Sequence, residues 1–175
     1  QQAILQAKDG NIWVVWASGN YDVFYKVFNG VTWSNETSLI TDPSLDITPS
    51  ISQTQDGRIW VVWASSRMGD YEIFHKTFNG SSWSPDKPLT TDTKKEDTNP
   101  TIFQTTDGVI WVVWAASEFT PTATDELYYM TSTDDGATWS ATNQLTQNTF
   151  DDTWPDAIQA RDFSIWITWG SNRDA

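Results

Sequence analysis

Three aspartates at matching positions in the chain are the first candidates for binding chemistry. Each lies three residues before a proline: Asp46, Asp97 and Asp152. Carboxylates gathered at one mouth of a channel accept hydrogen bonds from sugar hydroxyls and can hold Ca²⁺. Aspartates in such turns also accept bonds from backbone N–H groups. We favour this structural role and keep ligand binding as the alternative.

Trp154 stands among acidic residues in the stretch "FDDTWPDA" and is the second candidate. An exposed indole could stack on a sugar ring while the neighbouring carboxylates bind its hydroxyls. The plainer interpretation is an isolated surface aromatic. The candidate ligand-binding set is therefore Trp154 with Asp152, Asp97 and Asp46.

Other chemistry is poorly supported by the composition. The chain has no cysteine and a single histidine, His75, so a zinc site is not expected. No loop has the dense oxygen spacing of an EF-hand, and we expect no cofactor, with Ca²⁺ at the aspartates as the alternative. The formal net charge of -13 argues against nucleic acid and anionic membranes as partners.

The segments that carry these residues belong to an internal sequence repeat. "DGNIWVVWAS" at residue 9 returns as "DGRIWVVWAS" at 56 and "DGVIWVVWAA" at 107, with a diverged copy, "RDFSIWITWGS", at 161. "YDVFYKVFNGVTWS" at 21 likewise returns as "YEIFHKTFNGSSWS" at 71 and, more loosely, near 125. Repetition at this period is typical of stacked supersecondary units.

Each unit predicts four antiparallel strands. A DG turn joins the first two strands, and a second glycine turn precedes the last. The apolar run "IWVVWA" alternates between two apolar faces, as expected for a strand covered on both sides. The prediction is an all-β propeller arc of about three and a half blades. The blades span about 1–47, 48–98 and 99–154, and a partial fourth spans 155–175.

The segment "STDDGATWS" carries a family resemblance. Its match to the Asp-box pattern rests on five positions: Ser132, Asp134, Gly136, Thr138 and Trp139. The segment resembles the turn of bacterial neuraminidase (BNR) repeats, and the chain is similar to sialidase-like propeller repeats of bacterial and archaeal surface proteins. The resemblance implies an extracellular or cell-surface location. It also implies that these five residues form a structural turn away from any active site.

A complete sialidase would need an arginine triad for the substrate carboxylate. Arg58 and Arg161 flank turns between first and second strands, while Arg67 and Arg173 occupy matching positions in the repeat. These positions do not indicate a triad, so we expect the chain not to be an enzyme and to have no catalytic residues. Part of a sialidase-like glycoside hydrolase, or a carbohydrate-binding lectin, remains the alternative.

The fourth unit stops after its second strand, which would leave an unpaired edge and an apolar face. We therefore expect a fragment whose copies associate, as a homodimer or larger homo-oligomer, to complete a ring. The predicted function is a scaffold or recognition module, with glycans as the candidate ligands.

Overall fold

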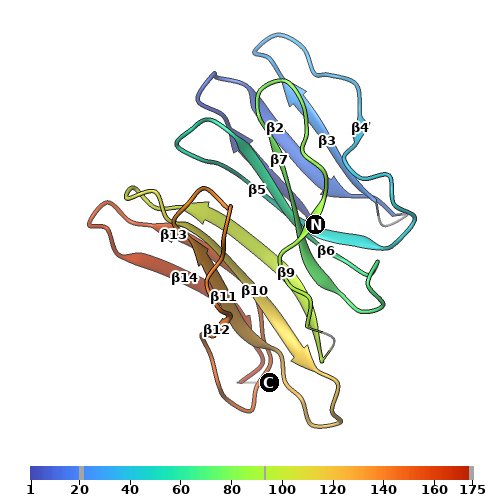
Figure 1. Ribbon diagram of the computed structural model, residues 1–175, viewed down its shortest axis with the longest axis vertical. Helices are drawn as coiled ribbons and strands as arrows, with labels where there is room; N and C mark the ends of the chain where they lie inside the picture. The colour runs from blue at the N-terminus through green and yellow to red at the C-terminus, as the bar shows by residue number, and fades with distance from the viewer. Residues whose placement is uncertain (20–21, 93, 174–175) are drawn as a thin grey trace.

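The protein is an arc of four β-sheets arranged as successive propeller blades (Figure 1). The computed structural model describes residues 1–19, 22–92 and 94–173. Tyr21, the first residue of one repeat phrase, and residues 174–175 of the partial blade lie outside them. Three sheets have four strands and the fourth has two, so the predicted propeller arc is confirmed.

The strands follow the chain in order within each blade. The first blade contains β1 (Gln2–Gln6), β2 (Ile12–Ala17), β3 (Val23–Phe28) and β4 (Thr37–Ser38). The second contains β5 (Asp46–Gln53), β6 (Ile59–Ser65), β7 (Glu72–Phe78) and β8 (Lys87–Pro88). The third contains β9 (Lys95–Gln104), β10 (Ile110–Glu118), β11 (Glu126–Ser132) and β12 (Asn143–Gln144). The partial fourth contains β13 (Asp152–Gln159) and β14 (Ile165–Ser171). All neighbouring strands within a blade are antiparallel.

The DG turns form as the sequence predicts, because glycine takes a backbone conformation that other residues resist. Gly57 has φ of +89° between β5 and β6, and Gly108 has φ of +92° between β9 and β10. The strand after each turn is then held between two others. All seven residues of β6 are buried, which explains why both of its faces are apolar.

Each pair of neighbouring blades packs through an apolar core that contains tryptophans of the repeated phrase, and the arc has three such cores. Trp13 in β2 of the first blade shares an apolar core with Trp63 of the second, and Trp60 shares the next core with Trp114. Trp111 packs in the third core, against the partial blade. The first tryptophan of each "IWVVW" phrase thus faces the following blade, and the second faces the preceding one.

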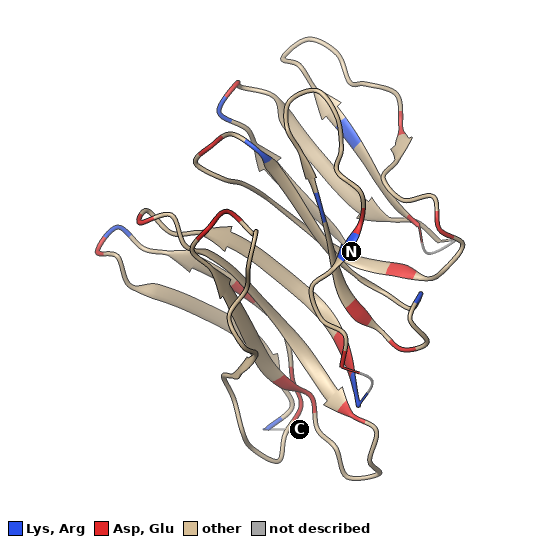
Figure 2. Cartoon of the chain, viewed as in Figure 1, with Lys and Arg blue, Asp and Glu red and all other residues tan. Residues whose placement is uncertain are grey.

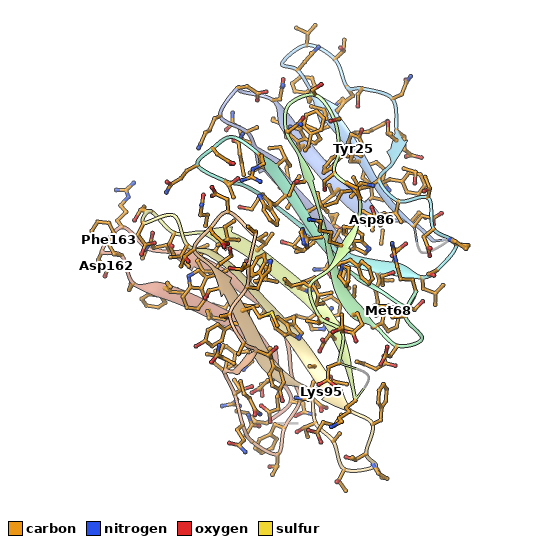
Figure 3. The ribbon with its side chains drawn as sticks, in the orientation of Figure 1. Tyr25, Met68, Asp86, Lys95, Asp162 and Phe163 are labelled. Atoms are coloured by element: carbon orange, nitrogen blue, oxygen red, sulfur yellow. The ribbon has the colours of Figure 1, made fainter. Side chains whose placement is uncertain are left out.

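The two ends of the arc each leave one blade face uncovered. The last blade exposes the face that carries the first tryptophan of the phrase, and the first blade exposes the opposite face. Trp166 in β14, the equivalent of Trp60, is 62% exposed, and Ile158 beside it is exposed as well. Ile4 is exposed on the first blade. Asp162 and Phe163 form the exposed tip of the turn between β13 and β14 (Figure 3). Acidic residues lie on all four blades, mainly in loops and at strand ends (Figure 2).

Candidate functional site

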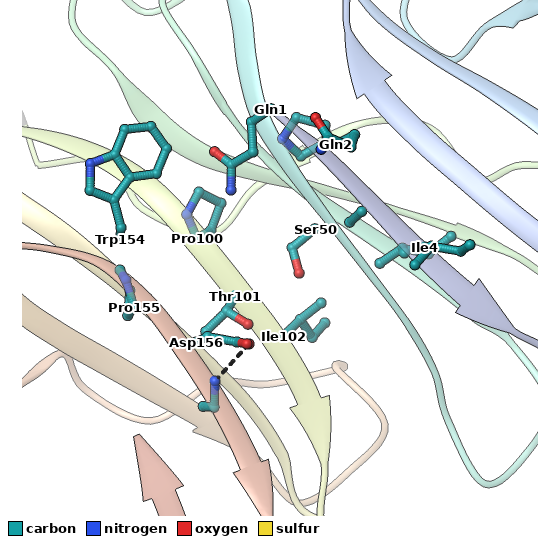
Figure 4. A pocket seen from close by; sticks show the side chains of 14 residues that line it. Gln1, Gln2, Ile4, Ser50, Pro100, Thr101, Ile102, Trp154, Pro155 and Asp156 are labelled. Carbon is teal, nitrogen blue, oxygen red and sulfur yellow. Dashed lines mark hydrogen bonds between the residues drawn. The ribbon is translucent and has the colours of Figure 1, made fainter. Parts of the chain in front are cut away.

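A cavity of about 450 Å³ lies where the inner strands β1, β5, β9 and β13 come together (Figure 4). Each inner strand contributes one short stretch, namely residues 1–4, 49–51, 100–102 and 154–157. The four stretches are equivalent in the repeat, so the cavity lies on the axis side of the arc. Its size is that of an ordinary small-ligand site.

A backbone irregularity shapes the entrance to this cavity. The pairing register shifts near the start of β5, β9 and β13, and each shift contains a residue with left-handed backbone immediately before a proline. These residues are Thr48, Asn99 and Trp154, with φ of 52°, 54° and 56°. Proline cannot donate to the ladder, which favours a bulge at this point.

Trp154 differs from its two equivalents in exposure. Thr48 and Asn99 are both buried. The backbone N–H of Asn99 donates a hydrogen bond to Thr48 Oγ1 at 3.3 Å. Trp154 is 57% exposed and lines the cavity beside Gln1 and Pro100 (Figure 4). A left-handed backbone costs a bulky residue about 1–2 kcal/mol, and such strain gathers at functional sites. Trp154 is therefore the strongest candidate for ligand contact.

The polar groups of the cavity follow the prolines. Ser50, Thr101 and Asp156 occupy equivalent positions, and only the last brings a carboxylate. Asp156 is exposed, and its Oδ1 accepts a hydrogen bond from the Ala157 amide at 2.9 Å (Figure 4). Its Oδ2 accepts no bond from the described residues. The amides of Gln1 and Gln2 complete the set.

All three predicted aspartates are buried, and none of them lines this cavity. Asp46 accepts a hydrogen bond from Trp63 Nε1 at 2.9 Å and lies 3.3 Å from Arg67 Nη2. Asp152 is equally buried and lies 3.2 Å from Arg173 Nη2. Both begin inner strands rather than standing in the loops before them. In this arrangement Asp46 and Asp152 contact residues of their own blades rather than the cavity, and ligand binding by them stays a prediction.

The pKa values of these two carboxyls reflect their partners. Burial raises the pKa of Asp46, in spite of bonds from Ser65, Trp63 and Arg67. Burial also acts on Asp152, but hydrogen bonds from Ser171, Asn148, Arg173 and Trp169 outweigh it and lower its pKa. Both aspartates stabilise their own blades through these buried hydrogen bonds and ion pairs.

Asp97 is the third member of the set and has a different environment. Glu118 occupies the repeat position that Arg67 fills in the second blade, so no arginine stands beside Asp97. The buried Glu72 lies against it instead. Burial raises the pKa of Asp97 to about 6 and that of Glu72 to about 8. Asp97 borders a second cavity between blades and is absent from the central one.

The residues of the predicted Asp-box form a hydrogen-bonded turn between β11 and β12. Asp134 Oδ1 accepts from Ser132 Oγ and from the Thr138 amide, both at 2.8 Å, and Oδ2 accepts from Thr138 Oγ1 at 2.6 Å. These bonds, with that of Thr138 Oγ1 the largest influence, lower the pKa of Asp134 to about 2. Trp139 packs edge-on against Trp60 of the preceding blade.

His75, Arg58 and Arg67 form contacts within and between blades. His75 stacks on Trp60, and burial lowers its pKa to about 4. Arg58 pairs with Asp56, and Arg67 pairs with Asp86 at 2.8 Å as well as with Asp46. In the described part of the chain, the arginines therefore do not converge on one site. Nor do the described residues hold a group of three or more His, Asp or Glu side chains suited to a metal ion. They include no helix long and apolar enough to cross a membrane.

Comparison with known proteins identifies the family. Residues 65–155 match the BNR repeat-like domain. The match covers just over half of the chain, so the chain belongs to this family. No curated protein matches the sequence significantly.

Solved structures share the fold at low identity. A Dyadobacter fermentans protein of unknown function matches with a TM-score of 0.76 and 16% identity over 97% of this chain and 56% of that one. A Penicillium chrysogenum α-L-arabinanase, solved with arabinobiose, matches with a TM-score of 0.72 and 16% identity over 96% of this chain and 58% of that one. A Streptococcus pneumoniae sialidase matches with a TM-score of 0.63 and 14% identity over 95% of this chain and 26% of that one. The chain thus spans well under two thirds of the length of these relatives.

These matches overturn the expectation that the chain is not an enzyme. An arabinanase and a sialidase share its architecture, so the fold is related to that of glycoside hydrolases. That expectation rested on the scattered arginines, which bear only on sialic acid chemistry. An identity of 14–16% establishes the fold alone, so the chemistry of this chain has to be argued from its own residues.

Sequence reasoning found Trp154 but missed the rest of the cavity. Ser50, Thr101 and Asp156 each follow the proline of an inner strand, a repeat position that is visible in the sequence. Nothing in the sequence shows that this position faces the axis, because the bulge shifts the alternation of side chains there.

Proposed function

We propose that the central cavity binds carbohydrate and that the chain forms part of a glycoside hydrolase-type propeller. The observation that carries this proposal is Trp154, an exposed indole held on a strained backbone at the rim of the cavity. Indole faces stack on the apolar faces of sugar rings, and the amides, hydroxyls and carboxylate below it suit sugar hydroxyls.

Asp156 is the group we assign to chemistry in this cavity. Glycoside hydrolysis generally needs two carboxyl groups, one on each side of the scissile bond. Asp156 is the single carboxylate side chain among the described residues that line the cavity. We therefore propose that it supplies one of the pair and that further blades supply the other.

Sugar binding is tested with the variant Trp154→Ala and a matched control. Isothermal titration with arabinobiose and β-1,3-galactobiose should detect binding that Trp154→Ala weakens at least tenfold. The control is Trp33→Ala, since Trp33 is 50% exposed but lies in an outer turn away from the cavity. Equal affinity in both variants, or no binding by the wild type, would overturn the proposal.

Hydrolysis requires a separate assay. In a longer chain or an assembled ring that cleaves arabino- or galacto-oligosaccharides, Asp156→Asn should abolish turnover and retain binding. Turnover that is unchanged in Asp156→Asn would remove this residue from the mechanism without affecting the binding proposal.

We further propose that copies of the chain associate through their two open faces. The exposed face around Trp166 is equivalent to the face through which Trp60 contacts the following blade. The first blade exposes its opposite face, which in the other blades contacts the preceding blade. A head-to-tail pair of arcs would cover both kinds of face. The second copy would then stand where further blades stand in the longer relatives.

Sedimentation velocity tests this association. Trp166→Glu should shift the assembly to monomer, while Phe163→Glu should not, because Phe163 is 70% exposed at a turn outside the face. A wild-type chain that is monomeric at tens of micromolar would refute the association.

A further inference from the structure

We infer that the central cavity selects neutral sugars and disfavours sugars that carry a carboxylate, such as sialic and uronic acids. This inference rests on the proposed carbohydrate binding and adds the class of ligand. Its basis is the charge of the cavity. Among the described residues that line it there is no lysine or arginine, and Asp156 is the single charged side chain.

Three of the four arginines pair with carboxylates outside the cavity, namely Arg58, Arg67 and Arg173, and Arg161 does not line the cavity. Arg67 is mostly buried between Asp46 and Asp86, with contacts of 3.3 Å and 2.8 Å. Arg173 contacts Asp152 at 3.2 Å. Turning either side chain into the cavity would leave a buried aspartate without its cation, which is strongly unfavourable. The cavity is therefore not expected to gain a cation by rearrangement of these residues.

An anionic ligand would meet two unfavourable conditions in this site. Its carboxylate would lose water without gaining a cationic side chain as a partner. It would also approach the Asp156 carboxylate within a protein of formal net charge -13. Neutral sugars avoid both conditions. Their hydroxyls can donate to Asp156 Oδ2 and accept from the amides of Gln1 and Gln2, while a ring face stacks on Trp154.

The test compares a neutral and an acidic disaccharide and adds one acidic trisaccharide. Gln1 lines the cavity and its free α-amino group would add a cation there, so the protein is tested with an acetylated N-terminus. Isothermal titration of this wild type at low salt with β-1,3-galactobiose and with digalacturonate should show at least tenfold weaker binding of the acid. 3′-Sialyllactose should bind as weakly as digalacturonate. In Asp156→Asn the difference between galactobiose and digalacturonate should shrink severalfold, because the repelling charge is gone.

A gain of function provides the second arm. Ser50→Lys places a cation on the cavity wall and should bring the affinity for digalacturonate up to or above that for galactobiose. Val31→Lys adds the same charge at an outer turn and should leave the preference unchanged. Circular dichroism of each variant verifies that it is folded.

The outcomes separate the two proposals. If no sugar binds the wild type, carbohydrate binding fails and this inference fails with it. If digalacturonate or 3′-sialyllactose binds as tightly as galactobiose, carbohydrate binding stands and the selection of neutral sugars is refuted. A preference for neutral sugars that Asp156→Asn leaves unchanged refutes the electrostatic origin of the selection.

Discussion

Replacing Gly136 with alanine should destabilise the protein through a single steric contact between blades. Gly136 lies in the Asp-box turn with φ of +80°, and a Cβ at this residue would stand 2.2 Å from Cη2 of Trp60. Trp60 is buried against His75 and cannot move aside freely. Left-handed backbone costs alanine about 1–2 kcal/mol, and overpacking adds about 1–3 kcal/mol. The expected loss in unfolding free energy is thus about 2–5 kcal/mol, a large share of a typical domain's stability.

Gly80→Ala separates the two contributions. Gly80 has φ of +94° in the equivalent turn of the second blade, but a Cβ at this residue would have no neighbouring atom within 4 Å. Its substitution should therefore cost only the backbone part, about 1–2 kcal/mol. Urea unfolding followed by circular dichroism gives both values under the same conditions. If the two variants lose the same free energy within about 0.5 kcal/mol, the contact with Trp60 is not what excludes a side chain at Gly136.

Three further predictions concern the buried and paired carboxyls. Glu72 has a pKa of about 8 in the fold, against an ordinary value of 4.5. Between these pH values the folded state therefore keeps a proton that the unfolded state has released. Stability should fall as pH rises from about 5 to 8, and Glu72→Gln should flatten this dependence in thermal melts; an unchanged slope would refute it. Arg67→Ala should cost about 2–4 kcal/mol by leaving Asp46 buried without its cation, and Arg173→Ala should cost less because Arg173 is more exposed, as urea unfolding can show. Asp134→Ala should lower Tm at pH 7 and reduce the loss of stability on acidification from about pH 4 to 2, since the wild-type carboxyl has a pKa of about 2 in the fold; equal acid sensitivity in both proteins would contradict this.

The strands and their turns could be predicted because their causes are local. Glycines in the DG turns and alternating apolar residues in "IWVVWA" specify hairpins and strands without reference to distant residues. Repetition then indicated that each sheet packs on the next, and Trp60, Trp63 and Trp114 are buried as that packing requires.

The site was harder to predict, since it depends on how equivalent residues face their neighbours. Asp46, Asp97 and Asp152 occupy one repeat position, yet the first and last pair with arginines and Asp97 lies against Glu72. The partner lies just after the neighbouring strand for Asp46 and Asp152, and in the preceding blade for Asp97, which spacing alone does not reveal.

The amino-acid pattern is enough to specify the repeating blade, its hairpins and the tryptophans between sheets, because periodicity and turn chemistry act over a few residues. The burial of the aspartates within the blades, and the cavity shared by Trp154 and Asp156, depend on the tertiary structure. So does the exposure of Trp166, whose equivalent Trp60 is buried. These outcomes follow from which surfaces the blades bring together, and closely similar phrases in the sequence meet different neighbours in space.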